Sequence, residues 1–240
     1  EIEHGFQPMP DLLDQALRDG PLDGLIVASP ANPTGSMLSD RDLEALAAYC
    51  DEHGIRLVSD EIYHGVTYTG KAATALAYSP NAIVINSFSK YFSMTGWRLG
   101  WMLVPEELTQ VCEYLGQNLF ISPPTLSQIA ATAAFDCKVE LDANVARYAR
   151  NRTLMLEELP KIGFDKLAPA DGAFYLYADV SKLTNDSQEF CARMLSETGV
   201  AATPGLDFDA ARGHRFMRFS FAGATDDVAA AVEALRVWDR

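Results

Sequence analysis

Three short apolar runs, each followed by polar residues, constrain the fold of this chain more than any other feature. They lie at residues 25–28, from about 56 to 59, and at 82–86, and the last reads Ala-Ile-Val-Ile-Asn. Such runs are typical of buried parallel strands. Between the first two runs, Ser39 is expected to cap a helix whose apolar stripe stops before Gly54. The pattern therefore predicts βαβ organisation and an α/β fold.

The polar residues that follow these runs are the candidates for a functional site. Asn32 lies in an Asn-Pro-Thr-Gly turn, Asp60 closes the second run, and Lys90 ends the sequence Ser-Phe-Ser-Lys after the third. In open α/β sheets, ligands bind at the carboxyl edge of the strands. A lysine in a dry site there can lose its proton and act as an amine nucleophile. Taken singly, each motif has an ordinary explanation: Asn-Pro-Thr-Gly fits a common turn, Asp60 a helix cap, and Lys90 a solvated surface lysine.

In this order and spacing, the motifs resemble those of the pyridoxal-phosphate-dependent aminotransferases of class I and II, the aspartate aminotransferase superfamily of fold type I. The resemblance spans nearly the whole chain. It rests on Asn-Pro-Thr-Gly at 32–35, Asp60 with Tyr63, Ser87 to Lys90, Arg98, and Arg218 within Phe-Met-Arg-Phe-Ser.

The resemblance implies the catalytic roles. Lys90 is expected to form a Schiff base with pyridoxal 5'-phosphate and to move the proton of the reaction. Asp60 is expected to keep the pyridine nitrogen protonated, which strengthens the ring as an electron sink. Tyr63 and Asn32 are expected to hydrogen-bond the 3' oxygen of the ring.

The resemblance also implies the binding roles. Arg98 and Ser87 are expected to hold the cofactor phosphate, and Arg218, with Asn32, the substrate carboxylate, since a guanidinium offers a bidentate fork. A surface charge remains the alternative for Arg98, and a structural ion pair for Arg218. Phe174 fits a core position better than a pocket wall.

The chain is predicted to have two parts, separated near Ser-Pro-Pro at 122–124. Residues 1–122 are expected to form the carboxyl-terminal part of a large cofactor-binding domain with a partial, mostly parallel sheet, including a buried strand at 99–104. Residues 123–240 are expected to form linking helices at 125–135 and 139–160 and a smaller α+β domain. That domain should contain strands at 172–180 and near 200 and 218, with helices at 187–198 and from 225 onward.

Composition excludes some partners. The formal net charge of −14 argues against nucleic acid and anionic membranes as partners. Without a long apolar span or a signal-like segment, a cytoplasmic location is the default expectation. The four cysteines and four histidines show no metal-ligand spacing, so we expect no metal site.

Members of the resembled family are longer, and their preceding segment supplies a glycine-containing phosphate-binding turn that is not seen before Asn32. We therefore expect this chain to be the carboxyl-terminal portion of a homodimeric enzyme that acts on an amino acid and a 2-oxo acid. A pyridoxal-phosphate-dependent Cβ lyase and a non-catalytic aminotransferase-like sensor domain remain open as alternatives. The motifs leave the substrate side chain undetermined.

Overall fold

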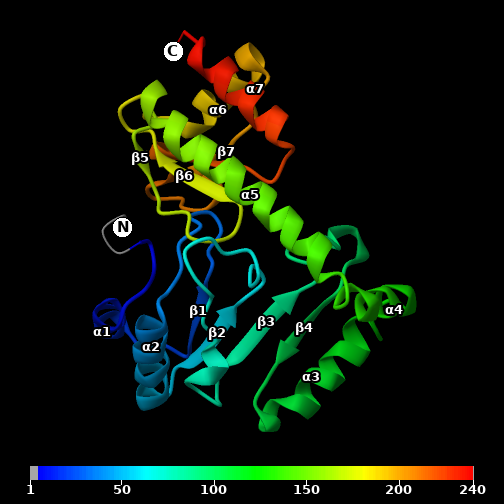
Figure 1. The fold of residues 1–240 in the computed structure, drawn as a ribbon. Helices are drawn as coiled ribbons and strands as arrows, with labels where there is room; N and C mark the ends of the chain where they lie inside the picture. The colour runs from blue at the N-terminus through cyan, green and yellow to red at the C-terminus, as the bar shows by residue number, and fades with distance from the viewer. Residues whose placement is uncertain (1–4, 240) are drawn as a thin grey trace.

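The chain folds into two lobes, each built on a four-stranded sheet (Figure 1). The structure is a computed structural model that describes residues 5–239. The strands of the first sheet are β1 (Gly24–Ala28), β2 (Arg56–Asp60), β3 (Ile83–Ser87) and β4 (Gly100–Leu103). Those of the second are β5 (Lys166–Leu167), β6 (Tyr175–Asp179), β7 (Thr203–Pro204) and β8 (Phe216–Ser220).

The first sheet has the order β1-β2-β3-β4, and its first three strands are parallel. Ala28 pairs with Asp60, and Asp60 pairs with Ile85, so the three strands end side by side. The chain segments that follow them therefore emerge at one edge of the sheet. The predicted α/β fold with a mostly parallel sheet is confirmed, and β4 adds an antiparallel pairing with β3.

The helices of the first lobe flank this sheet. They are α1 (Pro10–Asp19), α2 (Asp40–His53), α3 (Glu106–Leu119) and α4 (Thr125–Ala134). The Ser39 side chain accepts a hydrogen bond from the Asp42 amide at the start of α2, and Gly54 ends that helix in a left-handed conformation. The predicted apolar stripe of α2 is buried in the core of the lobe. Helix α1 was not predicted from the sequence.

The prediction of a buried strand at 99–104 is wrong in its burial. Met102 and Leu103 of β4 are 49% and 46% exposed. β4 is the last strand of the sheet and pairs only with β3 in the described part of the chain, so its apolar residues lack a covering layer. Hydrophobicity predicted the strand but could not show whether anything packs on it.

The second sheet has the order β5-β6-β8-β7 and is antiparallel throughout. Its lobe contains α5 (Lys138–Glu158), α6 (Ser187–Thr198) and α7 (Thr225–Arg236). Leu176, Ala178 and Met217 face a core shared with these helices. Strand β6 begins later than predicted, at Tyr175, and is buried on both faces rather than on alternate residues.

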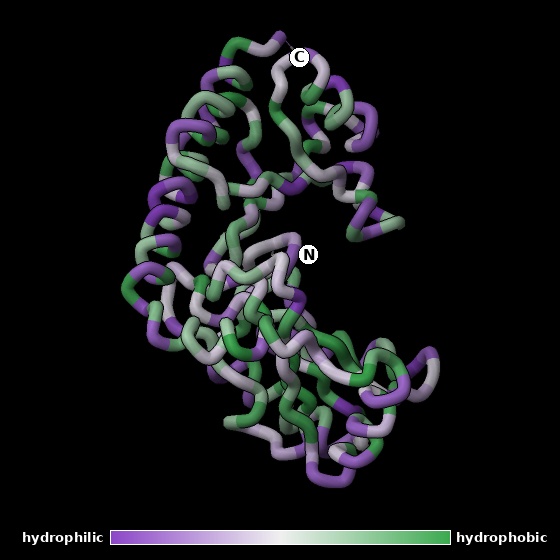
Figure 2. Tube along the Cα trace, turned by 90° about the vertical axis from the view of Figure 1, so that its right-hand side faces the viewer, coloured by the Kyte–Doolittle hydropathy of each residue, from purple (hydrophilic) through white to green (hydrophobic). Residues whose placement is uncertain are grey.

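Helix α5 runs from the first lobe along the second, and Figures 1 and 2 both show it as the long connection on one side of the molecule. Its Asn151 is fully buried and donates hydrogen bonds to the carbonyls of Phe221 (2.9 Å) and Gly223 (3.0 Å), just beyond β8. Helix α4 packs back on the first lobe, since Ala131 contacts the cluster of Phe88 and Met94. The domain boundary between 122 and 123 stays a prediction.

Candidate active site

Lys90 lies in the loop after β3 and is partly buried. Its Nζ is 5.4 Å from the ring centroid of Tyr63 and 5.9 Å from that of Phe174. Burial lowers the pKa of Lys90, as do the positive charges of Arg218 and Arg98, while Asp60 acts in the opposite direction. The site therefore favours the neutral amine more than water does.

Tyr91, which follows Lys90, anchors the loop through two contacts, one made by its ring and one by its hydroxyl. The ring of Tyr91 packs against Gly65, whose φ is +89°, and a Cβ there would lie 2.6 Å from Tyr91 Cδ2. The Tyr91 hydroxyl donates a 2.7 Å hydrogen bond to Asp142 of α5. Glycine at 65 thus permits close packing of the Lys90 loop against the segment after β2.

Asp60 ends β2 and lies close enough to Lys90 for the two charges to interact. Its Oδ1 accepts a 3.1 Å hydrogen bond from the Ile62 amide, and among residues 5–239 its Oδ2 has no hydrogen-bond partner. Burial raises the pKa of Asp60, and the Ile62 amide and the charges of Lys90 and His64 oppose that rise. One carboxylate oxygen is therefore available to a cationic group.

Tyr63 is almost completely buried, with 2% of its surface exposed. Its hydroxyl shares a 2.8 Å hydrogen bond with the hydroxyl of Tyr175 on β6. Burial, followed by this hydrogen bond, raises the pKa of Tyr63 well above its usual range. The phenol therefore stays protonated at neutral pH and can donate a hydrogen bond.

Arg218 of β8 reaches from the second lobe to the Asn32 turn of the first. Its two terminal nitrogens donate to Asn32 Oδ1 at 2.6 Å and to Thr203 Oγ1 at 3.1 Å. The guanidinium carbon lies 4.2 Å from the ring centroid of Tyr175 and 4.9 Å from that of Phe208. Two aromatic rings and two hydrogen bonds thus fix the plane of the guanidinium.

The Asn32 turn is packed closely against the second lobe at Gly35. Gly35 has a φ of +67°, and a Cβ there would lie 2.9 Å from both the Ala170 Cα and the Gly172 carbonyl oxygen. The Gly172 amide also donates to the Gly35 carbonyl at 2.8 Å. This contact allows Asn32 to meet Arg218, because it holds the two lobes together beside the site.

The two predicted phosphate-binding residues lie near Lys90, but neither is hydrogen-bonded to the side chains of this cluster in the described part of the chain. Arg98 is exposed, adopts a φ of +50°, and donates to the Thr95 carbonyl at 3.0 Å. The Ser87 hydroxyl accepts a 3.0 Å hydrogen bond from the Ser89 amide in the Lys90 loop. No hydrogen bond joins Arg98 to Ser87 in the part of the chain that the structure describes.

The structure thus brings Lys90, Asp60 and Tyr63 together, and it joins Asn32 to Arg218 across the two lobes. Sequence reasoning missed Tyr175, which contacts both Tyr63 and Arg218. The alternation of side chains along β6 could have indicated it, but only once the register of β6 against β8 was known. The assigned roles of all these residues stay predictions.

The described residues contain neither a metal site nor a membrane span. No group of three or more histidine, cysteine, aspartate or glutamate residues is placed to hold a metal ion within residues 5–239. Among those residues, no helix combines the length and apolar character needed to cross a membrane.

Comparison with known proteins gives consistent results along the whole chain. The family described as aminotransferase class I and II matches residues 2–235. Valine–pyruvate aminotransferase of Mycobacterium tuberculosis is 52% identical, over 97% of this chain and 61% of its own length. Aspartate/prephenate aminotransferase of Thermus thermophilus is 37% identical, over 96% of this chain and 60% of its own length.

Solved structures show the same likeness. A crystal structure of an aminotransferase from Mycobacterium tuberculosis superposes with a TM-score of 0.94 at 52% identity, and covers 98% of this chain and 61% of that one. Thermus thermophilus aspartate aminotransferase with maleate gives a TM-score of 0.89 at 34% identity, with 98% and 61% covered. The chain therefore spans about three fifths of the length of the relatives that it matches.

Proposed function

The chain belongs to the class I and II aminotransferase family, whose members depend on pyridoxal phosphate, and on that premise we propose that its protein transfers an amino group from an amino acid to a 2-oxo acid. The observation that supports the proposal is that two features occur together in one structure. A partly buried lysine of lowered pKa lies beside Asp60, and Arg218 is held across the lobes by Asn32.

The residues present fit pyridoxal phosphate. Lys90 offers an amine that burial makes more nucleophilic, and Asp60 offers a carboxylate oxygen without a protein partner in the described chain. Tyr63 offers a neutral hydroxyl, and Arg98 and Ser87 are suited to phosphate oxygens. When bound, the cofactor supplies an aldehyde that condenses with amines and a pyridinium ring that withdraws electrons.

Lys90 is proposed to carry the proton at the substrate Cα. A general base works best when its pKa lies near the working pH, and burial with two nearby arginines moves Lys90 in that direction. Asp60 is proposed to stabilise a positive charge on the ring nitrogen of the cofactor, because its partly buried carboxylate interacts strongly at low dielectric.

Arg218 is proposed to bind the substrate carboxylate. Its guanidinium plane is already fixed by Asn32, Thr203 and the ring of Tyr175, so little side-chain freedom is lost when a carboxylate binds. Asn32, which accepts from Arg218, is proposed also to hydrogen-bond the 3' oxygen of the cofactor ring. Arg98 and Ser87 are proposed to hold the phosphate.

The test is turnover by the full-length natural protein. Valine with pyruvate is the first pair to assay, because a relative at 52% identity is named for that pair. The proposal predicts alanine and a 2-oxo acid as products, and their loss in a Lys90→Ala variant. Lys71→Ala, at an exposed lysine, is the matched control and should keep activity. An active Lys90→Ala variant would contradict the assignment.

The same residues suit a pyridoxal-phosphate-dependent lyase, so the product identifies the reaction. Release of ammonia and pyruvate from a cysteine-like substrate, without a requirement for a 2-oxo acid, would indicate elimination at Cβ instead. A protein that binds an amino acid without turnover would indicate a sensor domain. The homodimer and the cytoplasmic location expected from the sequence remain part of this proposal.

A further inference from the structure

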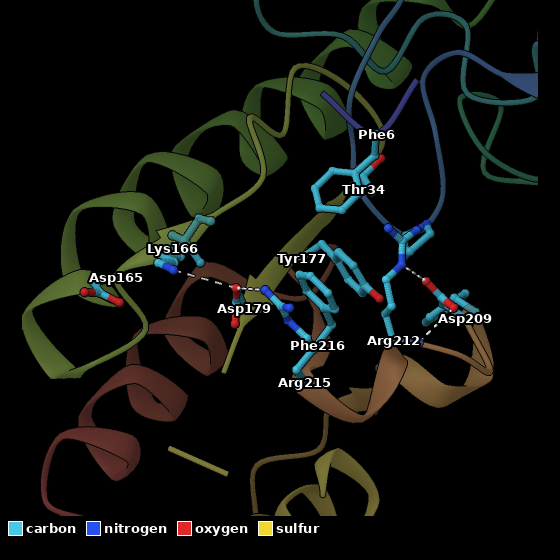
Figure 3. A pocket seen from close by; sticks show the side chains of 13 residues that line it. Phe6, Thr34, Asp165, Lys166, Tyr177, Asp179, Asp209, Arg212, Arg215 and Phe216 are labelled. Atoms are coloured by element: carbon cyan, nitrogen blue, oxygen red, sulfur yellow. Dashed lines mark hydrogen bonds and ion pairs between the residues drawn. The ribbon is translucent and has the colours of Figure 1, made fainter. Parts of the chain in front are cut away.

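A cavity of about 650 Å³ lies between the segment that follows Asn32 and the second sheet (Figure 3). Phe6 and the Pro33–Thr34 turn form one wall, and the face of the second sheet forms the other. The remaining lining residues are Asp165, Lys166, Leu167, Tyr177, Asp179, Phe208, Asp209, Arg212, Arg215 and Phe216. Its volume is within the range of small-molecule sites and exceeds the space that one amino acid needs.

The cavity is separate from the proposed catalytic residues. Neither Lys90 nor Arg218 lines it. Side chains of β6 alternate between faces, so Tyr175 and Tyr177 share one face of the sheet, and Tyr175 is the one bonded to Tyr63. Tyr177 pairs with Arg218 and Asp179 pairs with Phe216, so the cavity lies along β6 and β8 from the position of the clamp to Asp179.

Aromatic rings form the cavity wall. The rings of Tyr177 and Phe216 are stacked, with centroids 5.0 Å apart and planes 7° apart. Phe6 meets both edge-on, at 5.7 and 5.9 Å, and Phe208 meets Tyr177 edge-on at 6.3 Å. Aromatic rings pair favourably in edge-to-face and offset arrangements, so this wall is suited to an aromatic ligand side chain.

One polar group of the wall lacks a partner. Tyr177 is only 4% exposed, yet its hydroxyl makes no hydrogen bond within residues 5–239. Burial, and after it the charge of Asp209, raises the pKa of Tyr177 to about 12, against the effect of Arg212. The hydroxyl is therefore neutral at pH 7, and because Tyr177 lines the cavity it can donate a hydrogen bond to an acceptor there.

Among residues 5–239, the charged residues of the lining contain both signs in equal number, and each of them has an ion-pair partner. Asp179 bonds Arg215 at 3.0 Å and lies 3.9 Å from Lys166, and Asp209 bonds Arg212 at 3.1 Å. Asp165, which bonds Lys182 at 2.5 Å, completes three acids against three bases. A lining with no net charge disfavours a ligand of net charge, whereas carboxylates and cationic groups together complement both ends of a zwitterion.

We propose that this cavity binds a free α-amino acid with an aromatic side chain, at a site distinct from the candidate active site. The side chain lies against Tyr177, Phe216 and Phe6. The ligand carboxylate accepts from the Tyr177 hydroxyl near Arg212, and its ammonium lies toward the acidic residues of the lining.

The occupied cavity acts on the carboxylate clamp. Phe208 lines the cavity and also lies against the Arg218 guanidinium, and Pro33 follows Asn32, which bonds Arg218. A ligand in the cavity thus contacts two of the groups that hold Arg218 in place, and shifting either group shifts the guanidinium. The amino acid acts as an effector of substrate binding.

The test is calorimetric titration of L-phenylalanine into the full-length natural protein carrying Lys90→Ala, which prevents turnover. Binding should persist when Arg218→Met is added and weaken about tenfold when Tyr177→Phe is added, since that variant removes one hydrogen bond to a carboxylate. Tyr114→Phe, at an exposed tyrosine of α3, is the matched control and should bind as the parent does.

Two analogues test the zwitterion. 3-Phenylpropionate lacks the ammonium and 2-phenylethylamine lacks the carboxylate, and each should bind about tenfold or more weakly than L-phenylalanine. Binding that disappears with Arg218→Met and is unchanged by Tyr177→Phe would place the ligand in the active site and overturn the proposal, as would the absence of binding. Because the titration requires no turnover, its result is independent of the proposed aminotransferase activity.

Discussion

Replacing Arg218 by lysine tests whether the guanidinium is the substrate clamp. The guanidinium donates through two separate nitrogens, to Asn32 at 2.6 Å and to Thr203 at 3.1 Å, and lies 4.2 Å from the Tyr175 ring centroid. Its plane is thus set before a carboxylate arrives. A lysine ammonium is a single point charge, which cannot keep these interactions and also bind both oxygens of a carboxylate.

The size of the effect follows from the number of hydrogen bonds that each side chain can make to a carboxylate. Replacing a bidentate pair by a single charged hydrogen bond removes about 1.5–3 kcal/mol of binding free energy. That weakening corresponds to an increase in the KM of the amino acid of about 10- to 100-fold. The kcat should fall less than the ratio kcat/KM, because Lys90 and Asp60 are unchanged and the clamp acts mainly in binding.

The assay is steady-state kinetics of the full-length protein, with the amino acid and the 2-oxo acid varied in turn. Both substrates carry the carboxylate, so both KM values should rise. Arg193→Lys is the matched control, since Arg193 lies on α6 of the same lobe and pairs with Glu197. Unchanged KM values in Arg218→Lys, or an equal rise in Arg193→Lys, would refute the clamp.

Three further substitutions test the structure itself. Asn151→Leu should lower the free energy of unfolding by about 1–3 kcal/mol in urea titrations, because it leaves the carbonyl of the buried Phe221 without this partner and removes the bond to the exposed Gly223; an unchanged midpoint would contradict the role of Asn151. Lys90→Met should stabilise the protein at pH 7. Folding lowers the pKa of Lys90 below the ordinary lysine value of 10.5. Between the folded pKa and 10.5 the unfolded state therefore binds more protons than the folded state. The stability of the wild type consequently rises with pH in that range. The advantage of the methionine variant should therefore shrink by pH 10, and an advantage that grows would refute the sign. Ser39→Ala should cost about 1 kcal/mol through loss of the cap of α2, measured by the same titration, and no loss would show that the cap is dispensable.

Local signals in the sequence predicted the elements that depend on local physics. The cap at Ser39 and the left-handed Gly54 bound α2 as expected, and α6 has the predicted bounds of 187 and 198. Exposure of β4 was not predictable, because it depends on what packs against the strand rather than on its own residues. Helix α1 begins after Met9 without a side-chain cap, but Pro10 at its first position and Asp11 in its first turn are local start signals, so α1 could have been predicted.

The difference between local sequence signals and tertiary contacts also decides which residues of the site could be predicted. Lys90, Asp60 and Asn32 follow strand ends, so parallel pairing places them at one edge of the sheet. Tyr175 and Phe208 come from the second lobe, and their contacts with Arg218 depend on antiparallel register and on the close approach at Gly35. Neither the register nor the approach has a local sequence signal. The aromatic cavity was not predicted for the same reason.

The most direct test of the central claim is to identify the lysine that binds pyridoxal phosphate. The full-length natural protein is incubated with the cofactor, reduced with borohydride, digested, and analysed by mass spectrometry. The account predicts that the added mass lies on the peptide containing Lys90, and that Lys90→Ala abolishes it while Lys71→Ala does not. A label on another lysine, or an unmodified Lys90 peptide after reduction, would contradict the account.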